Sequence, residues 1–334
     1  MQQRIDSIDG AKALGIFLVI YAHTMLWKPL QDWIYVFHMP LFFFISGYLF
    51  SFARHQQKRS FIRQRFHRLM VPYFAINLVT YLFWLFVARH VGSGHDGAVS
   101  PLMPLKAALL GNGPMMLHDV PLWFLMCLFV VEIGYYALCH NKSRTTRICI
   151  TAAIALLGFA NSQYNPVTLP FSLGTAMVAL VFYSLGHESR LAGIRFRNTA
   201  VAILCVAATI AVAHFNGRIN MHKNFYNHYL PFLAGGICGT YATMWICTWA
   251  ESALPSICLR ALRFISRNTL YICGFHLMSF TFIKGIMVYV MHIRVSVMDD
   301  GVWLNLAFSV VSLIFCSVGI MVAQKCARLV SRAK

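Results

Sequence analysis

VWLNLAFSVVSLIFCSVGIMVAQ, residues 302–324, contains no charged side chain in 23 positions. An α-helix needs about 20 mostly apolar residues to cross the hydrocarbon core of a bilayer, so this stretch predicts a transmembrane helix. Nine similar runs precede it, and the chain is therefore predicted to be an all-α integral membrane protein, a bundle of about ten transmembrane helices. The predicted spans are 11–31, 33–53, 70–88, 121–139, 147–162, 170–187, 199–215, 228–249, 269–291 and 302–324.

The composition favours burial in a bilayer over a soluble fold. Hydrophobic residues make up 59% of the 334 residues and charged residues 11%, whereas a soluble domain carries charge on about a quarter of its residues. The net charge of +18 would suit a nucleic-acid-binding protein. The basic residues, however, form short clusters between apolar runs, which is typical of the loops of membrane proteins. No nucleic-acid partner is predicted.

The cysteines point to neither disulfides nor a metal centre. There are ten, most of them inside apolar runs, and no two form a CxxC pair. Small buried thiols within helices are therefore expected, and no metal site. The first apolar run is not followed by the small-residue cleavage site of a signal peptide, so the first predicted helix is expected to stay in the protein.

The distribution of basic residues predicts the orientation in the membrane. With a cytoplasmic N-terminus, 20 of the 28 lysines and arginines lie on the cytoplasmic side and six, including Lys106 and Lys223, on the opposite side. The remaining two, Lys12 and Lys284, lie within predicted helices. Cytoplasmic loops are enriched in Lys and Arg, so both termini are predicted to be cytoplasmic. Residues 1–334 are expected to form a single membrane domain.

The first predicted span contains two ionisable residues, Lys12 and His23, eleven positions apart. At 3.6 residues per turn this spacing puts both on one face of a helix, with a rise of about 16 Å between them. Ionisable side chains inside a membrane are costly and mark sites or pathways, and histidine, with a pKa of about 6.5, suits general-base catalysis at neutral pH. Two simpler interpretations stay open. Lys12 would be a snorkelling or orienting charge, and His23 a helix-packing hydrogen-bond partner.

Six further patterns occur in order along the chain. They are SIDGAKALGIFLVIYAH (7–23), FHMPLFFFISGYLF (37–50), RQRFHRLMVPYF (63–74), PLWFLMCLFVVE (121–132), LPFSLGTAMVALVFYSLGH (169–187) and RNTLYICGFH (267–276). Together they resemble integral-membrane acyltransferase family 3, which includes fucose-4-O-acetylase-like enzymes and polysaccharide O-acetyltransferases. One departure is Lys12, where many relatives have arginine. Lysine lacks the bidentate fork with which arginine holds phosphate.

The resemblance implies an O-acyltransferase in an inner (plasma) membrane of bacterial type. The implied donor is acetyl-CoA or another acyl-CoA on the cytoplasmic side, which acts as a substrate, with no tightly bound cofactor. The implied acceptor is a hydroxyl of a cell-surface or lipid-linked glycan.

The site residues expected from this reading begin with His23 as the catalytic general base, although a covalent acyl-histidine route stays open. Lys12, Arg65 and Arg68 are expected to bind the phosphates of CoA. The two arginines are three positions apart and so share one side of an α-helix. Further candidates for the site or its acceptor side are His38, Ser46, Trp123 and His276, with His118 and Asp119 as additional acceptor-side candidates.

Two other functions compete with acyl transfer. A polysaccharide exporter or flippase would also need many helices, but transporters commonly show inverted repeats or broken helices at matching positions, and the sequence shows no such repeat. A structural partner of a glycan synthase is the second alternative, and it predicts that His23 is dispensable.

Overall fold

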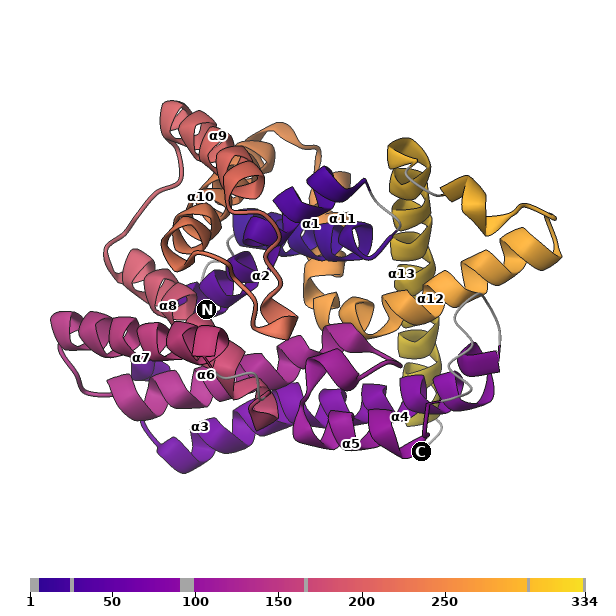
Figure 1. Ribbon diagram of the computed structural model, residues 1–334, viewed down its shortest axis with the longest axis horizontal. Coiled ribbons are helices and arrows are strands. Elements are labelled where there is room, and N and C mark those ends of the chain that lie inside the picture. The colour runs from indigo at the N-terminus through magenta and orange to yellow at the C-terminus, as the bar shows by residue number, and fades with distance from the viewer. Residues whose placement is uncertain (1–5, 25–26, 91–98, 165–167, 299–300, 333–334) are drawn as a thin grey trace. The chain divides into compact units, whose positions relative to one another are not determined.

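The computed structural model describes residues 6–24, 27–90, 99–164, 168–298 and 301–332, and in these ranges the regular structure is helical (Figure 1). No β-strand occurs in the described ranges, and Asn220 and Phe225 form an isolated bridge. The α-helices are α1 (Asp6–Ala22), α2 (Lys28–Leu49), α3 (Lys58–Arg65), α4 (Val71–Phe86), α5 (Leu102–Leu110), α6 (Trp123–Cys139), α7 (Arg144–Tyr164), α8 (Leu173–Leu191), α9 (Thr199–Phe215), α10 (Tyr229–Ala253), α11 (Ser256–Arg267), α12 (Thr269–Tyr289) and α13 (Val302–Arg332).

The all-helical membrane class is confirmed, and the structure contains candidate spans for much of the predicted bundle. Seven helices among the described residues are long and apolar enough to cross a membrane. They are Lys58–His90, Val120–Cys139, Arg144–Tyr164, Pro170–Leu191, Tyr229–Ala253, Thr269–Tyr289 and Val302–Ser331. Helix α9 is apolar but shorter, at 17 residues. The total of about ten spans and the cytoplasmic placement of both termini stay predictions.

The first helix is shorter than its predicted span, 11–31. Helix α1 ends at Ala22 after 17 residues, which corresponds to about 25 Å at 1.5 Å per residue. At this end the Thr24 hydroxyl donates to the carbonyl of Tyr21 (2.7 Å), so that carbonyl has a partner without a further helical turn. Helix α2 begins at Lys28 with Pro29 in its first turn, where the missing N–H of proline costs no hydrogen bond. His23 therefore lies one residue beyond α1.

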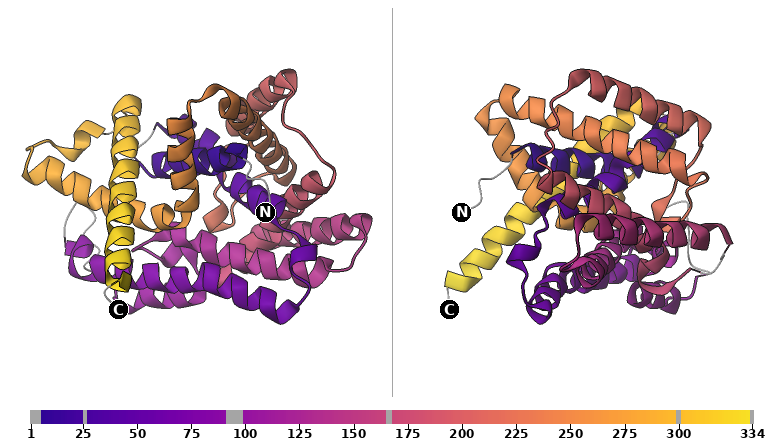
Figure 2. Two further views of the ribbon diagram at one scale, coloured as in Figure 1. Left: turned by 180° about the vertical axis from the view of Figure 1, so that it is seen from behind. Right: turned by 90° about the vertical axis from the view of Figure 1, so that its left-hand side faces the viewer.

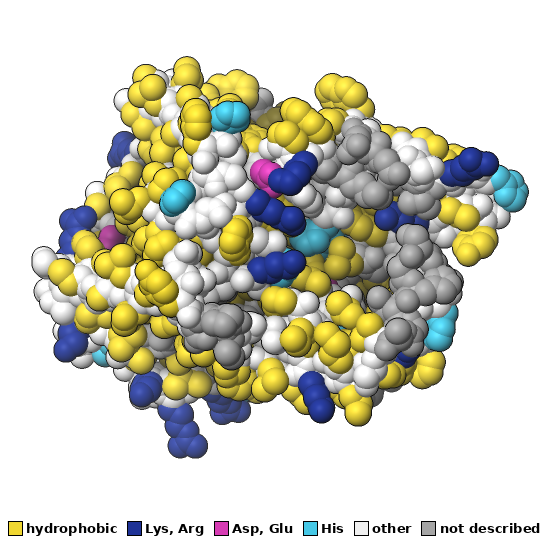
Figure 3. Space-filling model, viewed as in Figure 1, with side chains coloured by type: hydrophobic (Ala, Val, Ile, Leu, Met, Phe, Trp, Pro, Cys, Tyr) yellow, Lys and Arg dark blue, Asp and Glu magenta, His cyan; other side chains and the backbone are white. Residues whose placement is uncertain are grey.

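Exposed apolar side chains support burial of the helices in lipid. Helix α13 is one uninterrupted helix of 31 residues, visible as the long yellow helix in Figure 2. Hydrophobic side chains cover much of the molecular face in Figure 3, with few acidic ones among them. On α13 such exposed positions recur along the helix, at Val311, Ile314, Val318, Met321 and Val322. Exposed apolar surface on this scale is typical of contact with a membrane or another protein.

The chain divides into two compact units. The terminal unit comprises Met1–Ile34 and Ile246–Lys334, and the central unit comprises Tyr35–Trp245. In the terminal unit α1 packs against α11, α12 and α13. The Arg263 guanidinium of α11 forms two hydrogen bonds of 2.6 Å with the Asp6 carboxylate, and the Ser266 hydroxyl donates to Asp9 (2.6 Å). These contacts fix the first turn of α1 against α11.

In the central unit α6, α7 and α8 lie side by side (Figure 1), and α2 crosses α8 with backbones in contact. A Cβ atom at Gly47 would lie 1.8 Å from the carbonyl oxygen of Tyr183, and one at Gly186 would lie 2.0 Å from that of Phe44. These two glycines therefore permit the close approach of α2 and α8.

Gly47→Ala is expected to lower the melting temperature of the purified protein. The new methyl group meets rigid backbone, so α2 and α8 must separate, and overpacking of this kind costs about 1–3 kcal/mol. The matched control is Gly134→Ala in α6, where an added Cβ meets no atom within 4 Å and helix propensity gains about 0.5–1 kcal/mol. Equal melting temperatures for the two variants would contradict the close crossing.

Candidate functional site

His23 has a defined orientation at the end of α1. Its Nδ1 lies 2.7 Å from the carbonyl oxygen of Val19. Because a carbonyl only accepts hydrogen bonds, Nδ1 carries the proton in the neutral ring and Nε2 carries the lone pair. The side chain is half-buried. A histidine oriented by one nitrogen and basic at the other has the arrangement that a general base requires.

His276 of α12 is the partner that the structure places beside His23. The two ring centroids are 5.2 Å apart and the rings meet edge to face, at 72°. The His276 side chain is fully buried, at 0% exposed, and its Nδ1 donates to the Cys273 carbonyl (2.8 Å). Its Nε2 has no hydrogen-bond partner within the described ranges. A buried polar atom without a hydrogen-bond partner lowers the stability of the fold, which a purely structural site would not require.

Further polar contacts join the helices of the terminal unit that position the pair. The Tyr21 hydroxyl donates to the Val302 carbonyl (3.1 Å), which ties the end of α1 to the start of α13. Ser279 of α12 and Ser312 of α13 share a hydrogen bond of 2.6 Å between their hydroxyls. Lys12 lies half-buried on α1, eleven residues before His23. The surroundings of His23 and His276 are therefore fixed by contacts from three helices.

Arg65, at the end of α3, is buried in the central unit with a carboxylate partner. Its Nε lies 3.2 Å from Oε2 of Glu132 on α6, and its guanidinium lies over the Phe61 ring at 5.0 Å. Arg65 is only 7% exposed. Glu132 was not among the predicted site residues, although it is the only acidic residue in the run 121–139. An isolated intramembrane carboxylate is a signal for a buried partner.

Arg68 differs from Arg65 in exposure, although the charges of both arginines act on Glu132. Residues Phe66–Met70 form a π-helical turn between α3 and α4, in which hydrogen bonds run from i to i+5. The α-helical spacing that placed both arginines on one side does not hold through this turn, and Arg68 is exposed. Such turns occur frequently at functional sites.

His55 contacts Arg65 from the connection between α2 and α3. Nη2 of Arg65 lies 3.4 Å from Nε2 of His55 and donates to it, so that nitrogen acts as an acceptor. Partial burial lowers the pKa of His55, and the charges of Arg65 and Arg54 lower it further. His55 is accordingly neutral at physiological pH and adds no positive charge beside Arg65.

The other predicted residues are dispersed over the central unit. His38 on α2 is buried, with its ring 5.1 Å from that of Tyr35. Ser46 is half-buried on the same helix. Trp123, the first residue of α6, is 5% exposed and packs against Gly113. Trp123 therefore faces the protein interior, and its place on the acceptor side stays a prediction.

Residues 5–322 match a family described as the acyltransferase domain. The chain belongs to acyltransferase family 3. No curated protein and no solved structure matches the chain. The matched region of this acyltransferase extends over both units and includes His23, His276, Arg65 and Arg68.

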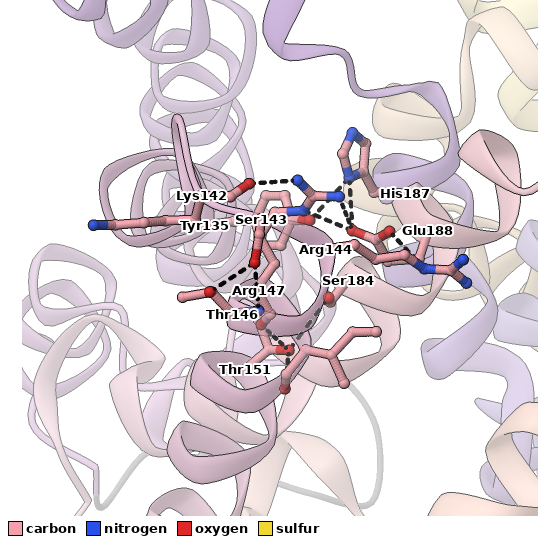
Figure 4. A network of polar contacts seen from close by, with 11 residues as sticks. Tyr135, Lys142, Ser143, Arg144, Thr146, Arg147, Thr151, Ser184, His187 and Glu188 are labelled. Carbon is pink, nitrogen blue, oxygen red and sulfur yellow. Dashed lines mark hydrogen bonds and ion pairs between the residues drawn. The ribbon is translucent and has the colours of Figure 1, made fainter.

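In this acyltransferase a second buried carboxylate, Glu188, joins α7 to α8. Figure 4 shows the carboxylate between the guanidinium groups of Arg147 and Arg144. Oε1 lies 2.7 Å from Nε and 2.6 Å from Nη2 of Arg147, and Oε2 lies 3.5 Å from Nε of Arg144. The neighbouring His187 contacts the Tyr135 hydroxyl through Nδ1 (2.9 Å). The network links α6, α7 and α8, and sequence analysis did not identify it.

His118 and Asp119 form a buried pair of titratable residues just before α6. His118 Nε2 donates to Oδ1 of Asn77 (2.9 Å), and burial lowers the pKa of His118 to about 4. Asp119 is 1% exposed, and its carboxyl oxygens accept no well-formed hydrogen bond from the described residues. Burial raises the pKa of Asp119 well above its ordinary value, whereas the lowered pKa of His118 keeps that ring neutral at physiological pH.

Asp119→Asn is expected to stabilise this acyltransferase increasingly as the pH rises. Burial raises the pKa of the carboxyl in the folded protein, so it stays protonated to a higher pH there than in the unfolded chain, where it ionises above about pH 4. Ionisation therefore stabilises the unfolded state by about 1.4 kcal/mol per pH unit across that window and lowers the free energy of unfolding by the same amount. Asparagine does not ionise, so the variant does not lose this stability. Melting temperatures in detergent at pH 5 and pH 8 measure the effect. A difference between wild type and variant that does not widen toward pH 8 would show that Asp119 is ionised in the fold.

Proposed function

We propose that this chain is a membrane O-acyltransferase that moves an acyl group, acetyl in the simplest case, from cytoplasmic acyl-CoA to a hydroxyl of a cell-surface or lipid-linked glycan. The observation that carries the proposal is the His23–His276 pair. It supplies an oriented imidazole with a basic Nε2 inside a chain of an acyltransferase family.

The proposed reaction is a direct transfer. Nε2 of His23 takes the proton of the acceptor hydroxyl as its oxygen attacks the thioester carbonyl. The carbon–sulfur bond then breaks, and the departing thiolate takes the proton from the His23 imidazolium. The products are an O-acyl ester and the free thiol of CoA, and the histidine is restored to its starting state. His276, packed edge to face against His23, restricts rotation of that ring and so acts as a positioning residue.

Positive charge on the predicted cytoplasmic side supports the use of a CoA donor. CoA is polyanionic, and arginine binds phosphate oxygens through charge-assisted hydrogen bonds. Lys12, Arg65 and Arg68 are the proposed contacts. Arg68 is exposed and would contact a phosphate group directly. Arg65 is buried and paired with Glu132, so it would contact only a phosphate group that enters the protein.

The experiment that tests the function compares glycans from cells with and without the protein. NMR of purified surface polysaccharide is expected to show O-acetyl signals that disappear after mild alkali and are absent in the strain lacking the chain. The exporter alternative predicts a different outcome, in which the amount of surface polymer falls and its acylation is unchanged. That outcome would replace the proposed function.

A further inference from the structure

A polar pocket of about 150 Å³ lies in the central unit, separate from every residue placed in the proposed chemistry. Three segments meet there. They are the connection after α5, the start of α8 together with the end of α7, and the short hairpin that precedes α10. The side chains that carry its polar character are Ser162, Thr168, Ser172, His222, Lys223 and Asn224.

The pocket is built by hydrogen bonds between these segments. The Ser172 hydroxyl donates to the Gly111 carbonyl (2.8 Å), and the Thr175 hydroxyl donates to the Met221 carbonyl (2.9 Å). The hairpin is closed by the bridge between Asn220 and Phe225. Hydrogen bonds therefore fix the three segments that line the pocket relative to one another.

The backbone around the pocket is locally strained. Phe171 and Ser172, two successive residues, have φ angles of 59° and 53°, and Asn224 has a φ of 54°. Left-handed backbone is uncommon for residues other than glycine. It costs about 1–3 kcal/mol where it occurs and tends to cluster at binding and catalytic sites. The strained backbone at Phe171 and Ser172 adjoins one wall of the pocket, and Asn224, a residue type that adopts this conformation more readily, adjoins another.

The size and the lining restrict the class of ligand. The volume of about 150 Å³ is less than the 300–1,000 Å³ typical of pockets for drug-sized ligands. It suits a polar ligand no larger than one monosaccharide. Hydroxyl, amide and imidazole side chains can exchange hydrogen bonds with a sugar, and the exposed Phe225 ring offers an apolar face. No acidic residue occurs among the described lining residues, whereas Lys223 supplies a positive charge.

We propose that this pocket binds one acidic sugar residue of a glycan. Lys223 would pair with the sugar carboxylate, and Phe225 would contact the apolar face of the ring. The hydroxyl oxygens of Ser162 and Ser172, whose own protons are donated to backbone carbonyls, would accept hydrogen bonds from the sugar hydroxyls. The three segments belong to connections that the charge distribution assigns to the external side, where surface glycans are found. The assignment of the ligand to a glycan rests on the proposed function, but the pocket itself does not depend on His23.

The test measures binding of methyl β-glucuronide and methyl β-glucoside to the purified full-length protein by saturation-transfer NMR. The glucuronide is expected to bind more tightly. Lys223→Gln is expected to weaken glucuronide binding about two- to fivefold, in the range of an exposed ion pair, and to leave glucoside binding unchanged. Phe225→Ala is expected to weaken both sugars about two- to tenfold.

Two matched controls lie near the same hairpin without lining the pocket. Arg218→Gln removes an exposed cation and Phe215→Ala an exposed aromatic ring, and neither is expected to change binding. Any of three results overturns the proposal. The first is that the glucuronide binds no more tightly than the glucoside, and the second is that Lys223→Gln still binds the glucuronide more tightly. The third is that inorganic phosphate displaces the glucuronide as effectively as a second sugar does. Melting temperatures check that the Phe225→Ala variant is folded. If that variant does not fold, Lys223→Gln still tests the site.

Acyl-transfer assays separate this proposal from the proposed function. If sugar binding shows the expected variant effects but no acyl group is transferred, the pocket stands and the transferase function fails. If transfer proceeds and Lys223→Gln changes neither binding nor the apparent acceptor affinity, the function stands and the pocket assignment fails.

Discussion

Replacing His23 with alanine is expected to slow acyl transfer by about two to four orders of magnitude, the usual contribution of a general base. The imidazole is the group that would accept the hydroxyl proton, and its Nδ1 is already engaged with the Val19 carbonyl. The hydrogen bond lost on substitution is local, between residues four positions apart. The helix itself is therefore expected to stay folded, and the amount of protein in the membrane to stay unchanged. Rates are measured as release of CoA thiol in membranes containing equal amounts of protein.

The control for this substitution is His214→Ala. His214 is an exposed histidine near the end of α9, outside every set of residues proposed to act in the reaction. Its substitution is expected to leave the rate unchanged. A His23→Ala enzyme that retains a rate within a few-fold of wild type would assign His23 a packing role, as would equal losses in the two variants.

Glu188→Ala is expected to destabilise the protein by about 3–5 kcal/mol, because it leaves the buried guanidinium of Arg147 without its counter-charge. The Arg147 side chain is 11% exposed and that of Glu188 6%, so water does not replace the lost partner. The expected result is a large drop in melting temperature, or loss of folded protein from the membrane. Asp32→Ala is the control, because its partner Lys28 is 66% exposed and a surface pair contributes about 0–1 kcal/mol.

A double variant distinguishes loss of charge balance from loss of packing. Replacing Glu188 and Arg147 together by leucine and methionine removes both buried charges, and substitutions of this kind are often neutral or stabilising. The double variant is expected to be more stable than Glu188→Ala alone. A double variant that is less stable than the single one would contradict the explanation by an unpaired buried arginine.

The long apolar runs made the helical class predictable from the sequence, because about 20 uncharged residues have few alternatives to a spanning helix. The end of the first helix was not predictable by the same rule. Hydropathy continues past Ala22, but Thr24 and Pro29 act through local hydrogen bonding and backbone geometry, which an average over a window does not register. Helix α11 was missed for a related reason. It is short and its arginines were interpreted only as orienting charges, whereas Arg263 pairs with Asp6.

Pairs of residues distant in sequence account for most of what the sequence did not reveal at the candidate site. His23 and His276 were separate candidates, and only the packing of α1 against α12 places their rings 5.2 Å apart. Glu132 ends one of the sequence patterns and Glu188 directly follows another, but neither pattern contains the arginine that pairs with the carboxylate. Their arginines lie on other helices, so periodicity along one helix carries no information about them. The catalytic and donor-binding roles stay predictions that the following measurement addresses.

The most direct test uses the purified protein in liposomes with acetyl-CoA labelled in the acetyl group and a glycan acceptor, and follows both the label and the released CoA thiol. The wild-type protein is expected to transfer label into alkali-labile esters of the glycan, with one thiol released per ester formed, and the His23→Ala protein is expected to do neither above background. Equal transfer by both proteins, or uptake of glycan into the liposomes without consumption of acetyl-CoA, would contradict acyl transfer through His23.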